Sequence, residues 1–219
     1  GGGEGVVVVG SNTGVVHGFD ASNGNELFGY IPSIFLGNLE GLTQSPFNFR
    51  YFADGELRYG QLDDGRHIVA GGFGAGAEGL FALDITDPTN PSVLFELSGS
   101  DAAYEAGEYV ERLGNVYGRP TIAKLPDGEW YVVAGNGFNS GQGGGFVLVR
   151  LDTGAVSYYA LPSDNPSTNG LAAPALVSST SNFSEVTHAY AGDLQGNLWR
   201  FDLSSRTTSL LFNTGANKP

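Results

Sequence analysis

The segment Gly74–Gly79 is the first place where the sequence could do chemistry, because it fits the Gly-x-Gly-x-x-Gly pattern of dinucleotide sites. In those sites the glycines open a helix, whose N-terminus binds the pyrophosphate. The residues that follow, Leu80 to Asp84, are instead typical of a β-strand. We therefore interpret Gly74–Gly79 as a glycine-rich hairpin turn and predict no nucleotide cofactor.

Carboxylates are the second candidate, because two Asp or Glu residues at a suitable separation hydrolyse glycosidic bonds. The acidic residues in turn or loop sequence are Asp54, Asp63, Asp64, Glu105, Glu108 and Glu111. The sequence does not give their separations in space, and loop carboxylates are ordinarily solvated surface groups. We therefore predict no catalytic residues and no enzymatic activity.

Histidine and cysteine give little support to a metal site. The chain has no cysteine, which removes disulfides, thiolate catalysis and sulfur-ligated metals. Its histidines occupy non-equivalent positions, since His17 falls inside a predicted strand whereas His67 and His188 lie at the start of apolar strands. No His-x-x-x-His spacing occurs. We interpret all three histidines as structural and predict no metal site.

The net charge narrows the range of partners. The chain carries a formal charge of −13, with 23 Asp and Glu against 10 Lys and Arg. A polyanion would be repelled, which argues against nucleic acid and against anionic lipid surfaces. The longest purely apolar run, Val6–Val9, is far too short to span a bilayer. We predict no membrane insertion and no nucleic-acid partner.

The elements that position these residues form a repeat. The chain has 35 glycines, 14 Phe and 10 Tyr, a composition that favours short strands and tight turns. In each copy of the repeat, an apolar run ending in Gly is followed by a turn and a run ending in Asp. The copies pair Val6–Gly10 with Gly14–Asp20, Ile68–Gly72 with Gly79–Asp84, Tyr131–Gly135 with Phe146–Asp152, and His188–Gly192 with Gly196–Asp202.

Further strands complete each unit. A third strand follows the pair at Glu26–Tyr30, Val93–Leu97, Val156–Ala160 and Ser209–Phe212. A leading strand precedes the last three pairs, around Leu57–Gln61, Arg119–Lys124 and Ala173–Val177. Units of four antiparallel strands are the blades of a β-propeller.

The predicted fold class is therefore all-β: a partial β-propeller of about four four-stranded antiparallel blades over residues 1–219. The first blade lacks its leading strand, and the chain stops after the last strand of the fourth. Unpaired blade edges are unfavourable, so we expect an open array from a larger ring and a fragment of a longer protein. The initiator residue and any signal peptide would then lie outside residues 1–219.

The Asp that ends each second strand also repeats. These residues are Asp20, Asp84, Asp152 and Asp202. Equivalent positions on separate blades lie far apart, so a shared ligand is not expected. We predict that each Asp accepts backbone N–H groups of the following turn.

Two inserts interrupt the pattern, at about residues 32–51 and 101–116, and both contain short stretches compatible with helix, Ser33–Leu36 and Ala102–Ala106. The first insert concentrates aromatic residues with little charge apart from an arginine, which suits a protein interface. Its candidate interaction residues are Phe35, Phe47, Phe49, Arg50, Tyr51 and Phe52. The alternative is that the insert caps the propeller and buries these rings within the chain itself.

Seven motifs stand out along the chain: Val16–Ala21, Gly24–Ser33, Gly71–Gly76, Gly79–Pro88, Tyr117–Pro120, Val133–Ser140 and Tyr190–Asp202. In their order, these motifs resemble the C-terminal propeller of PilY-type pilus-tip proteins. The resemblance covers nearly the whole chain, and the last motif is the most distinctive.

The resemblance implies an extracellular or cell-surface protein at the tip of type IV pili, reached through the periplasm. It implies roles in pilus assembly, retraction control and adhesion, with minor pilins or the pilus filament as partners and a host or abiotic surface as target. It also implies a longer parent, with a variable adhesive region before the propeller and more propeller after it.

One position departs from the family pattern. Many relatives carry an Asp-rich calcium loop before the strand that leads into the Tyr-Ala-Gly-Asp motif. Residues 179–187 occupy that position here, with Glu185 as their one carboxylate, whereas calcium takes six to eight oxygen ligands. We therefore do not carry the calcium site over, and calcium is expected, if anywhere, elsewhere in the parent.

Two other functions use similar repeats. The segment Phe19–Phe28 is similar to the repeat of pyrroloquinoline quinone dehydrogenases, which need a complete ring, a metal-coordinating set and often a vicinal disulfide. An outer-membrane assembly scaffold of the same quinoprotein-like repeat type is the other alternative. Co-purification with barrel-insertion machinery rather than pilins would distinguish it.

Overall fold

The computed structural model describes residues 5–46, 48–99, 110–162, 168–178 and 185–215, which form mainly short antiparallel strands. The first sheet contains β1 (Val6–Gly10), β2 (Val16–Asp20) and β3 (Glu26–Tyr30); the second contains β4 (Leu57–Gln61), β5 (His67–Gly72), β6 (Gly79–Asp84) and β7 (Ser92–Ser98). The third contains β8 (Thr121–Lys124), β9 (Trp130–Gly135), β10 (Gly145–Arg150) and β11 (Val156–Ala160); the fourth contains β12 (Ala175–Ser178), β13 (Val186–Gly192), β14 (Asn197–Asp202) and β15 (Thr207–Asn213). Short helices lie between strands in the described ranges: α1 (Ser33–Leu36), η1 (Leu39–Thr43) and η2 (Val110–Arg112).

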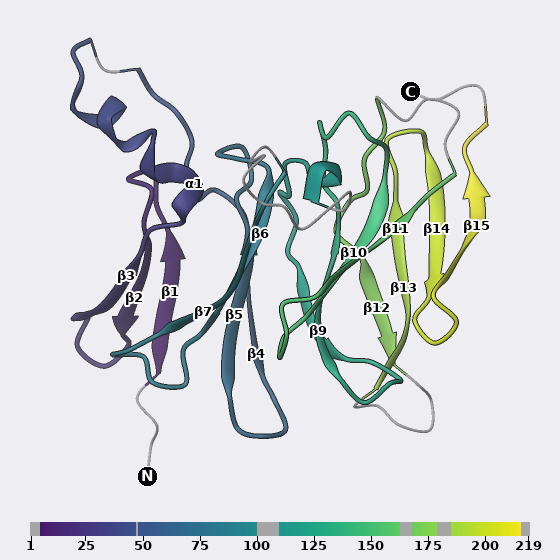
Figure 1. Cartoon of the computed structure of the whole chain (residues 1–219), viewed down its shortest axis with the longest axis horizontal. Helices are drawn as coiled ribbons and strands as arrows, with labels where there is room; N and C mark the ends of the chain where they lie inside the picture. The colour runs from purple at the N-terminus through teal and green to yellow at the C-terminus, as the bar shows by residue number, and fades with distance from the viewer. Residues whose placement is uncertain (1–4, 47, 100–109, 163–167, 179–184, 216–219) are drawn as a thin grey trace.

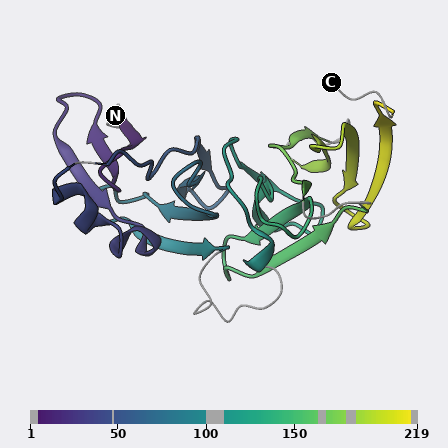
Figure 2. The ribbon, with the colours of Figure 1, turned by 90° about the horizontal axis from the view of Figure 1, so that it is seen from above.

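Each sheet is an antiparallel meander whose strands follow chain order (Figure 1). The sheets succeed one another along an arc, with the N-terminal and C-terminal blades at its two ends (Figure 2). This arrangement is that of propeller blades, and it confirms the predicted fold class. Among the described residues, the first sheet has three strands and each of the others has four.

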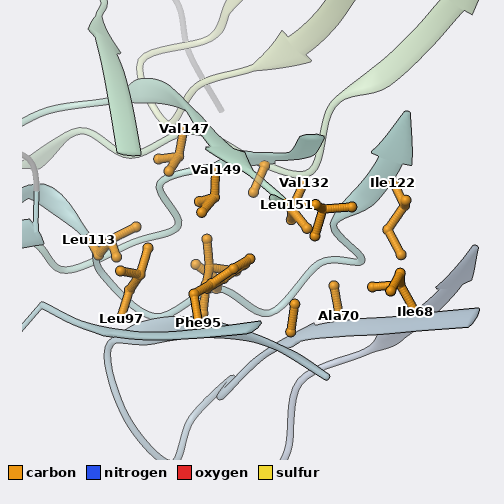
Figure 3. Packing of buried hydrophobic residues seen from close by; sticks show 14 of the residues in the cluster. Ile68, Ala70, Phe95, Leu97, Leu113, Ile122, Val132, Val147, Val149 and Leu151 are labelled. Carbon is orange, nitrogen blue, oxygen red and sulfur yellow. The ribbon is translucent and has the colours of Figure 1, made fainter. Parts of the chain in front are cut away.

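The blades are held together by apolar side chains that fill the space between successive sheets. Between the second and third sheets, Ile68 and Ala70 of β5 face Ile122 and Val132 of the next blade (Figure 3). Between the third and fourth sheets, Phe146 stacks on Phe201 with ring centroids 5.0 Å apart. The second and third sheets are covered on both faces, so their central strands β5, β6, β9 and β10 are mostly buried along their whole length. In the first and fourth sheets, the strands β2 and β14 instead alternate between buried and more exposed residues.

One close approach between blades requires a glycine. A Cβ built on Gly60 of β4 would lie 2.9 Å from Ile122 Cγ2 of β8. The leading strands of adjacent blades are thus in contact, as expected near the axis of a propeller, where neighbouring blades come closest.

The strand register corrects one part of the predicted repeat. The Gly that ends the apolar strand pairs with Val16, Leu80, Phe146 and Leu198 in the successive blades. Four residues further on lie Asp20, Asp84 and Asp202, but in the third blade this position is Arg150. Asp152 is therefore displaced by two residues from the position it was predicted to share.

The hydrogen bonds agree with this register. Asp20, Asp84 and Asp202 each accept the backbone N–H two residues ahead, at 2.7, 2.9 and 2.9 Å, which confirms the predicted turn role at these sites. Asp152 instead accepts Arg150 Nε at 2.6 Å. The prediction for Asp152 was wrong because it aligned residue types without knowing the pairing.

A buried asparagine joins the loops of three segments. The side chain of Asn136 is fully buried and donates to the carbonyls of Arg112 and Gly143, at 2.8 and 2.7 Å. Its Oδ1 accepts the N–H groups of Gly145 and Leu171, at 3.0 and 3.1 Å. These bonds satisfy all its polar capacity and link the connections before β8 and before β12 to the β9–β10 hairpin.

Asp193 plays a related part in the last blade, where it follows β13. Its carboxylate accepts Trp199 Nε1 at 2.9 Å, Asn197 Nδ2 at 2.8 Å and the Gln195 N–H at 2.9 Å. Partial burial of Asp193 raises its pKa, but these hydrogen bonds outweigh the burial, and the net effect lowers the pKa below its usual 3.8. The ionised form thus stabilises the turn that leads into β14.

We expect Asp193 to make the fold sensitive to acid. A folded-state pKa below the unfolded one means that its contribution is complete above the unfolded pKa near 3.8 and is lost as pH falls through the folded pKa. Asp193→Asn should lower the free energy of unfolding at pH 7 and weaken its decline on acidification. Urea unfolding from pH 7 to pH 2 measures both effects, with exposed Asp54→Asn as control. Parallel acid profiles for Asp193→Asn and the unmodified chain would contradict this role.

Candidate functional site: the aromatic insert between the first two blades

The first insert connects β3 of the first blade to β4 of the second, and it contains α1 and η1 (Figure 1). The predicted helix at Ser33–Leu36 is confirmed as α1. The second predicted helix, Ala102–Ala106, lies outside the described residues, as does most of the second insert. Apart from Phe47, the first insert lies within the described residues.

Two of the predicted interaction residues are buried, which corrects their assignment as exposed aromatics. Phe35 and Phe52 are each only 1% exposed. Their rings meet edge to face at 5.4 Å, and Phe35 meets Phe73 in the same way at 5.2 Å. Phe73 in turn stacks on Phe81 of β6 at 5.5 Å. Phe35 and Phe52 thus pack into the core between the first and second blades. For these two residues, the alternative that the insert caps the propeller and buries its rings is the correct one.

The fit of these rings depends on a glycine in the turn that resembled a nucleotide motif. A Cβ at Gly76 would lie 1.7 Å from the backbone oxygen of Phe52. Gly74–Gly79 connects β5 directly to β6, with no helix between them, so the predicted hairpin turn is confirmed. The glycines therefore serve close packing against the insert.

A carboxylate fixes the start of the insert. Glu96 of β7 accepts hydrogen bonds from the hydroxyls of Tyr30 and Ser33 and from the N–H of Ile34, the last at 3.3 Å. Charge-assisted bonds of this kind are stronger than neutral ones. Sequence reasoning missed Glu96, because its partners lie more than sixty residues away and no local pattern marks it.

The other half of the cluster is exposed. Phe49 is 60% exposed and Tyr51 is 47% exposed, and their rings meet edge to face at 5.0 Å. Arg50 lies between them in sequence and is also exposed; its Nη1 donates to Asn38 Oδ1 at 2.9 Å. Leu36, at the end of α1, is 58% exposed. Phe47 lies outside the described residues.

The aromatic residues of the first insert therefore fall into a buried group and an exposed group. Phe35 and Phe52 hold the insert in the core, while Phe49, Arg50 and Tyr51 are presented to solvent on the same segment. The guanidinium carbon of Arg50 lies 5.8 Å from the centroid of the buried Phe52 ring, so the two groups are adjacent. Large exposed aromatics beside an arginine can bury apolar area and donate hydrogen bonds to a partner, but they offer no nucleophile or general base.

The histidines each have a local partner. His17 Nδ1 lies 2.7 Å from Glu26 Oε1, His67 Nδ1 lies 2.7 Å from the Tyr59 hydroxyl, and His188 Nδ1 lies 3.0 Å from Thr187 Oγ1. They lie on three different blades. Within the described ranges, no group of three or more His, Asp or Glu residues is placed to hold a metal ion.

Two of the loop carboxylates form ion pairs at the surface. Asp63 pairs with Lys124 of the next blade at 2.7 Å, and Asp64 pairs with Arg66 at 2.8 Å. Asp54 and Glu111 are exposed. Glu105 and Glu108 lie outside the described residues, as do residues 179–184 of the segment 179–187 that the sequence analysis considered for calcium.

In the part of the chain that the structure describes, no helix has the length and apolar character to cross a membrane.

The protein is a β-propeller by its fold. A model of the PilY1 β-propeller domain matches residues 3–210. The chain therefore belongs to the PilY1 β-propeller family, as the motifs predicted.

Individual relatives support the same family assignment. The chain is 38% identical over 205 residues to the type IV pilus biogenesis factor PilY1 of Pseudomonas aeruginosa strain PAO1, covering 90% of this chain and 17% of the relative. It is 37% identical over 204 residues to a PilY1 homologue of Xylella fastidiosa, covering 91% of this chain and 16% of the relative. The chain thus spans about a sixth of the length of these curated relatives.

Solved structures lead to the same fold. The crystal structure of the Pseudomonas aeruginosa PilY1 C-terminal domain matches with a TM-score of 0.72 and 34% identity, covering 90% of this chain and 38% of that one. BamB from Moraxella catarrhalis matches with a TM-score of 0.52 at 15% identity, which shows a shared fold and nothing more.

We expect Glu96→Ala to loosen the insert. Removal of the carboxylate leaves the donors of Tyr30, Ser33 and Ile34 without this acceptor, and bonds to charged groups contribute about 2 kcal/mol. The free energy of unfolding should fall by about this amount, and proteolysis should cut residues 32–51 sooner. Glu40→Ala, an exposed acidic residue of η1, is the matched control and should change stability by less than about 0.5 kcal/mol. Unchanged proteolysis in the Glu96 variant would show that the insert is held by its rings alone.

Proposed function

We propose that this chain is the propeller module of a type IV pilus biogenesis factor and acts as a non-enzymatic scaffold for protein interactions. The observation that carries the proposal is the family match over residues 3–210, together with relatives that are named as type IV pilus biogenesis factors. Because the chain spans about a sixth of those relatives' length, the proposal concerns one module of a larger activity.

The stacked blades suit a scaffold rather than a catalyst. Face-to-face packing of sheets gives a stiff support on which loops can be displayed. The surface that we assign to binding is the exposed part of the first insert, around Phe49, Arg50 and Tyr51. Aromatic and arginine side chains are the commonest energetic anchors of protein interfaces. Their rigid attachment through Phe35 and Phe52 reduces the entropy lost when a partner binds.

The proposed setting is the cell surface at the pilus tip, reached through the periplasm. The proposed partners are minor pilins or the pilus filament, and the module would also support adhesion to host or abiotic surfaces. The net charge of −13 favours partners with basic or neutral contact surfaces. No cofactor enters this proposal.

Filament association is the test of the setting. We expect peptides of this chain in surface filaments sheared from the cells that produce it, identified by mass spectrometry, and a strong reduction in a strain that lacks the major pilin. The two strains are compared at equal total shed protein, with an unrelated surface protein as control. Equal recovery from both strains would reject the pilus setting and leave a propeller whose partner is elsewhere.

The binding surface has a separate test. We expect the double variant Phe49→Ser and Tyr51→Ser to bind purified pilus filaments about 100-fold more weakly, if each ring contributes about 1.4 kcal/mol. Stability should change by less than about 0.5 kcal/mol, because both side chains are exposed. Val93→Ser with Leu194→Ser, which removes exposed apolar groups from other blades, is the matched control. Equal binding by both double variants would remove the insert from the interface.

A further inference from the structure

A pocket of about 310 Å³ lies where the connections before β8 and β12 meet the end of β9. Two backbone bridges join its walls, because Asn115 pairs with Phe138 and Gly137 pairs with Leu171. The fully buried Asn136 precedes Gly137 and accepts the Leu171 N–H at 3.1 Å. The walls are therefore held by hydrogen bonds within the chain, and a ligand would enter a preformed site.

An aromatic pair forms one side of this pocket. Tyr117 is 43% exposed, and its ring centroid lies 6.2 Å from that of the partly buried Phe138. The other walls contain small residues, among them Gly118, Gly135 and Ala173. None of the described residues that line the pocket is charged. The pocket therefore combines an exposed ring with apolar, uncharged walls.

One position of the repeat explains why the space beside Tyr117 is open. Counting back from the strand pairing in each blade, Glu56, Arg119 and Ala173 occupy equivalent positions before the leading strand. The first two form an ion pair, with Arg119 Nε 3.2 Å from Glu56 Oε2. In the fourth blade this position is an alanine, whose Cβ lies 2.5 Å from a Cβ built on Gly118. The fourth blade therefore has no long side chain at this position to cover Tyr117.

Uncharged polar groups lie next to the aromatic pair. The exposed Asn139 follows Phe138, and its Nδ2 donates to Asn115 Oδ1 at 3.1 Å. Asn115 is itself fixed, because its Nδ2 donates to the Gly74 carbonyl at 2.8 Å. A side-chain amide offers two N–H donors and one acceptor oxygen. The bond to Asn115 therefore leaves Asn139 with an N–H group and an oxygen that can bond a ligand.

We propose that this pocket binds a pyranose ring of a neutral saccharide, which stacks on Tyr117 and bonds the amide of Asn139. A pyranose presents C–H groups that pack on an aromatic ring, and its hydroxyl groups need hydrogen-bond partners at the rim. The volume lies at the lower end of the range for small-molecule sites, roughly 300–1,000 Å³, which favours a sugar ring over an extended peptide segment. A neutral ligand also avoids the repulsion that a formal charge of −13 would exert on an anionic glycan.

Saturation-transfer NMR on the natural full-length polypeptide tests this site. The probes are methyl β-D-glucopyranoside and methyl β-D-galactopyranoside, and we expect both to bind, with the strongest saturation at their ring C–H protons. Tyr117→Ala should weaken binding about tenfold through loss of stacking. Tyr117→Phe keeps the ring and should bind within about twofold of the unmodified chain. Tyr59→Ala, which removes a tyrosine of similar exposure, 52%, from β4, is the matched control and should leave binding unchanged.

A second variant separates the amide of Asn139 from the fold. Asn139 has a left-handed backbone, with a φ of 69°, which glycine adopts readily. Asn139→Gly should therefore keep the urea midpoint of unfolding unchanged while sugar binding weakens about fivefold.

Three results would overturn the proposal. They are no saturation transfer to either sugar, sugar binding that neither Tyr117→Ala nor Asn139→Gly weakens, and binding of a tetraproline peptide in place of sugar that Tyr117→Ala abolishes. The last result would assign the pocket to a protein partner. The sugars are measured without filaments and at a site apart from the first insert, so this inference and the proposed pilus function can fail independently.

Discussion

The structure depends on the burial of one sheet face against the next. Each blade is too thin to have a core of its own, so its side chains find apolar surroundings only in the adjacent blade. The stacked rings of Phe146 and Phe201 and the layer around Ile68 and Ile122 show this interaction. Removing a whole buried side chain of this size from such a layer costs about 3–5 kcal/mol. Stability therefore depends on neighbours, and a blade at the end of the array is the least protected.

That constraint explains where polar groups are allowed. Buried polar atoms occur at the ends of strands, where loops from successive blades meet, and each needs a full set of partners. Asn136 satisfies backbone groups of three segments, and Asp193 holds the turn before β14 through its ionised carboxylate. Both residues follow the Gly that ends the apolar strand of their blade. This position therefore holds polar groups at the end of the strand: Asn136 bonds loops of neighbouring segments, and Asp193 bonds the turn of its own blade.

The local pattern of the sequence was enough to predict the blades, but not the strand register within them or the side-chain packing between them. The strand pairs and α1 were predictable because hydrophobic runs, turn glycines and the repeat are local signals. The displacement of Asp152 was not, because register is set by pairing across the hairpin rather than by residue type. The burial of Phe35 and Phe52 was also beyond reach, since it depends on Phe73 and Gly76, which arrive from the next blade.

Burial between neighbouring blades also separates the aromatic residues of the insert into two groups. Rings that reach the junction of the first two blades are covered and fix the segment, and rings a few residues away stay in water. A surface of this kind is costly for an isolated monomer unless something covers it, which is why exposed aromatics on a rigid loop favour a binding role over a purely structural one.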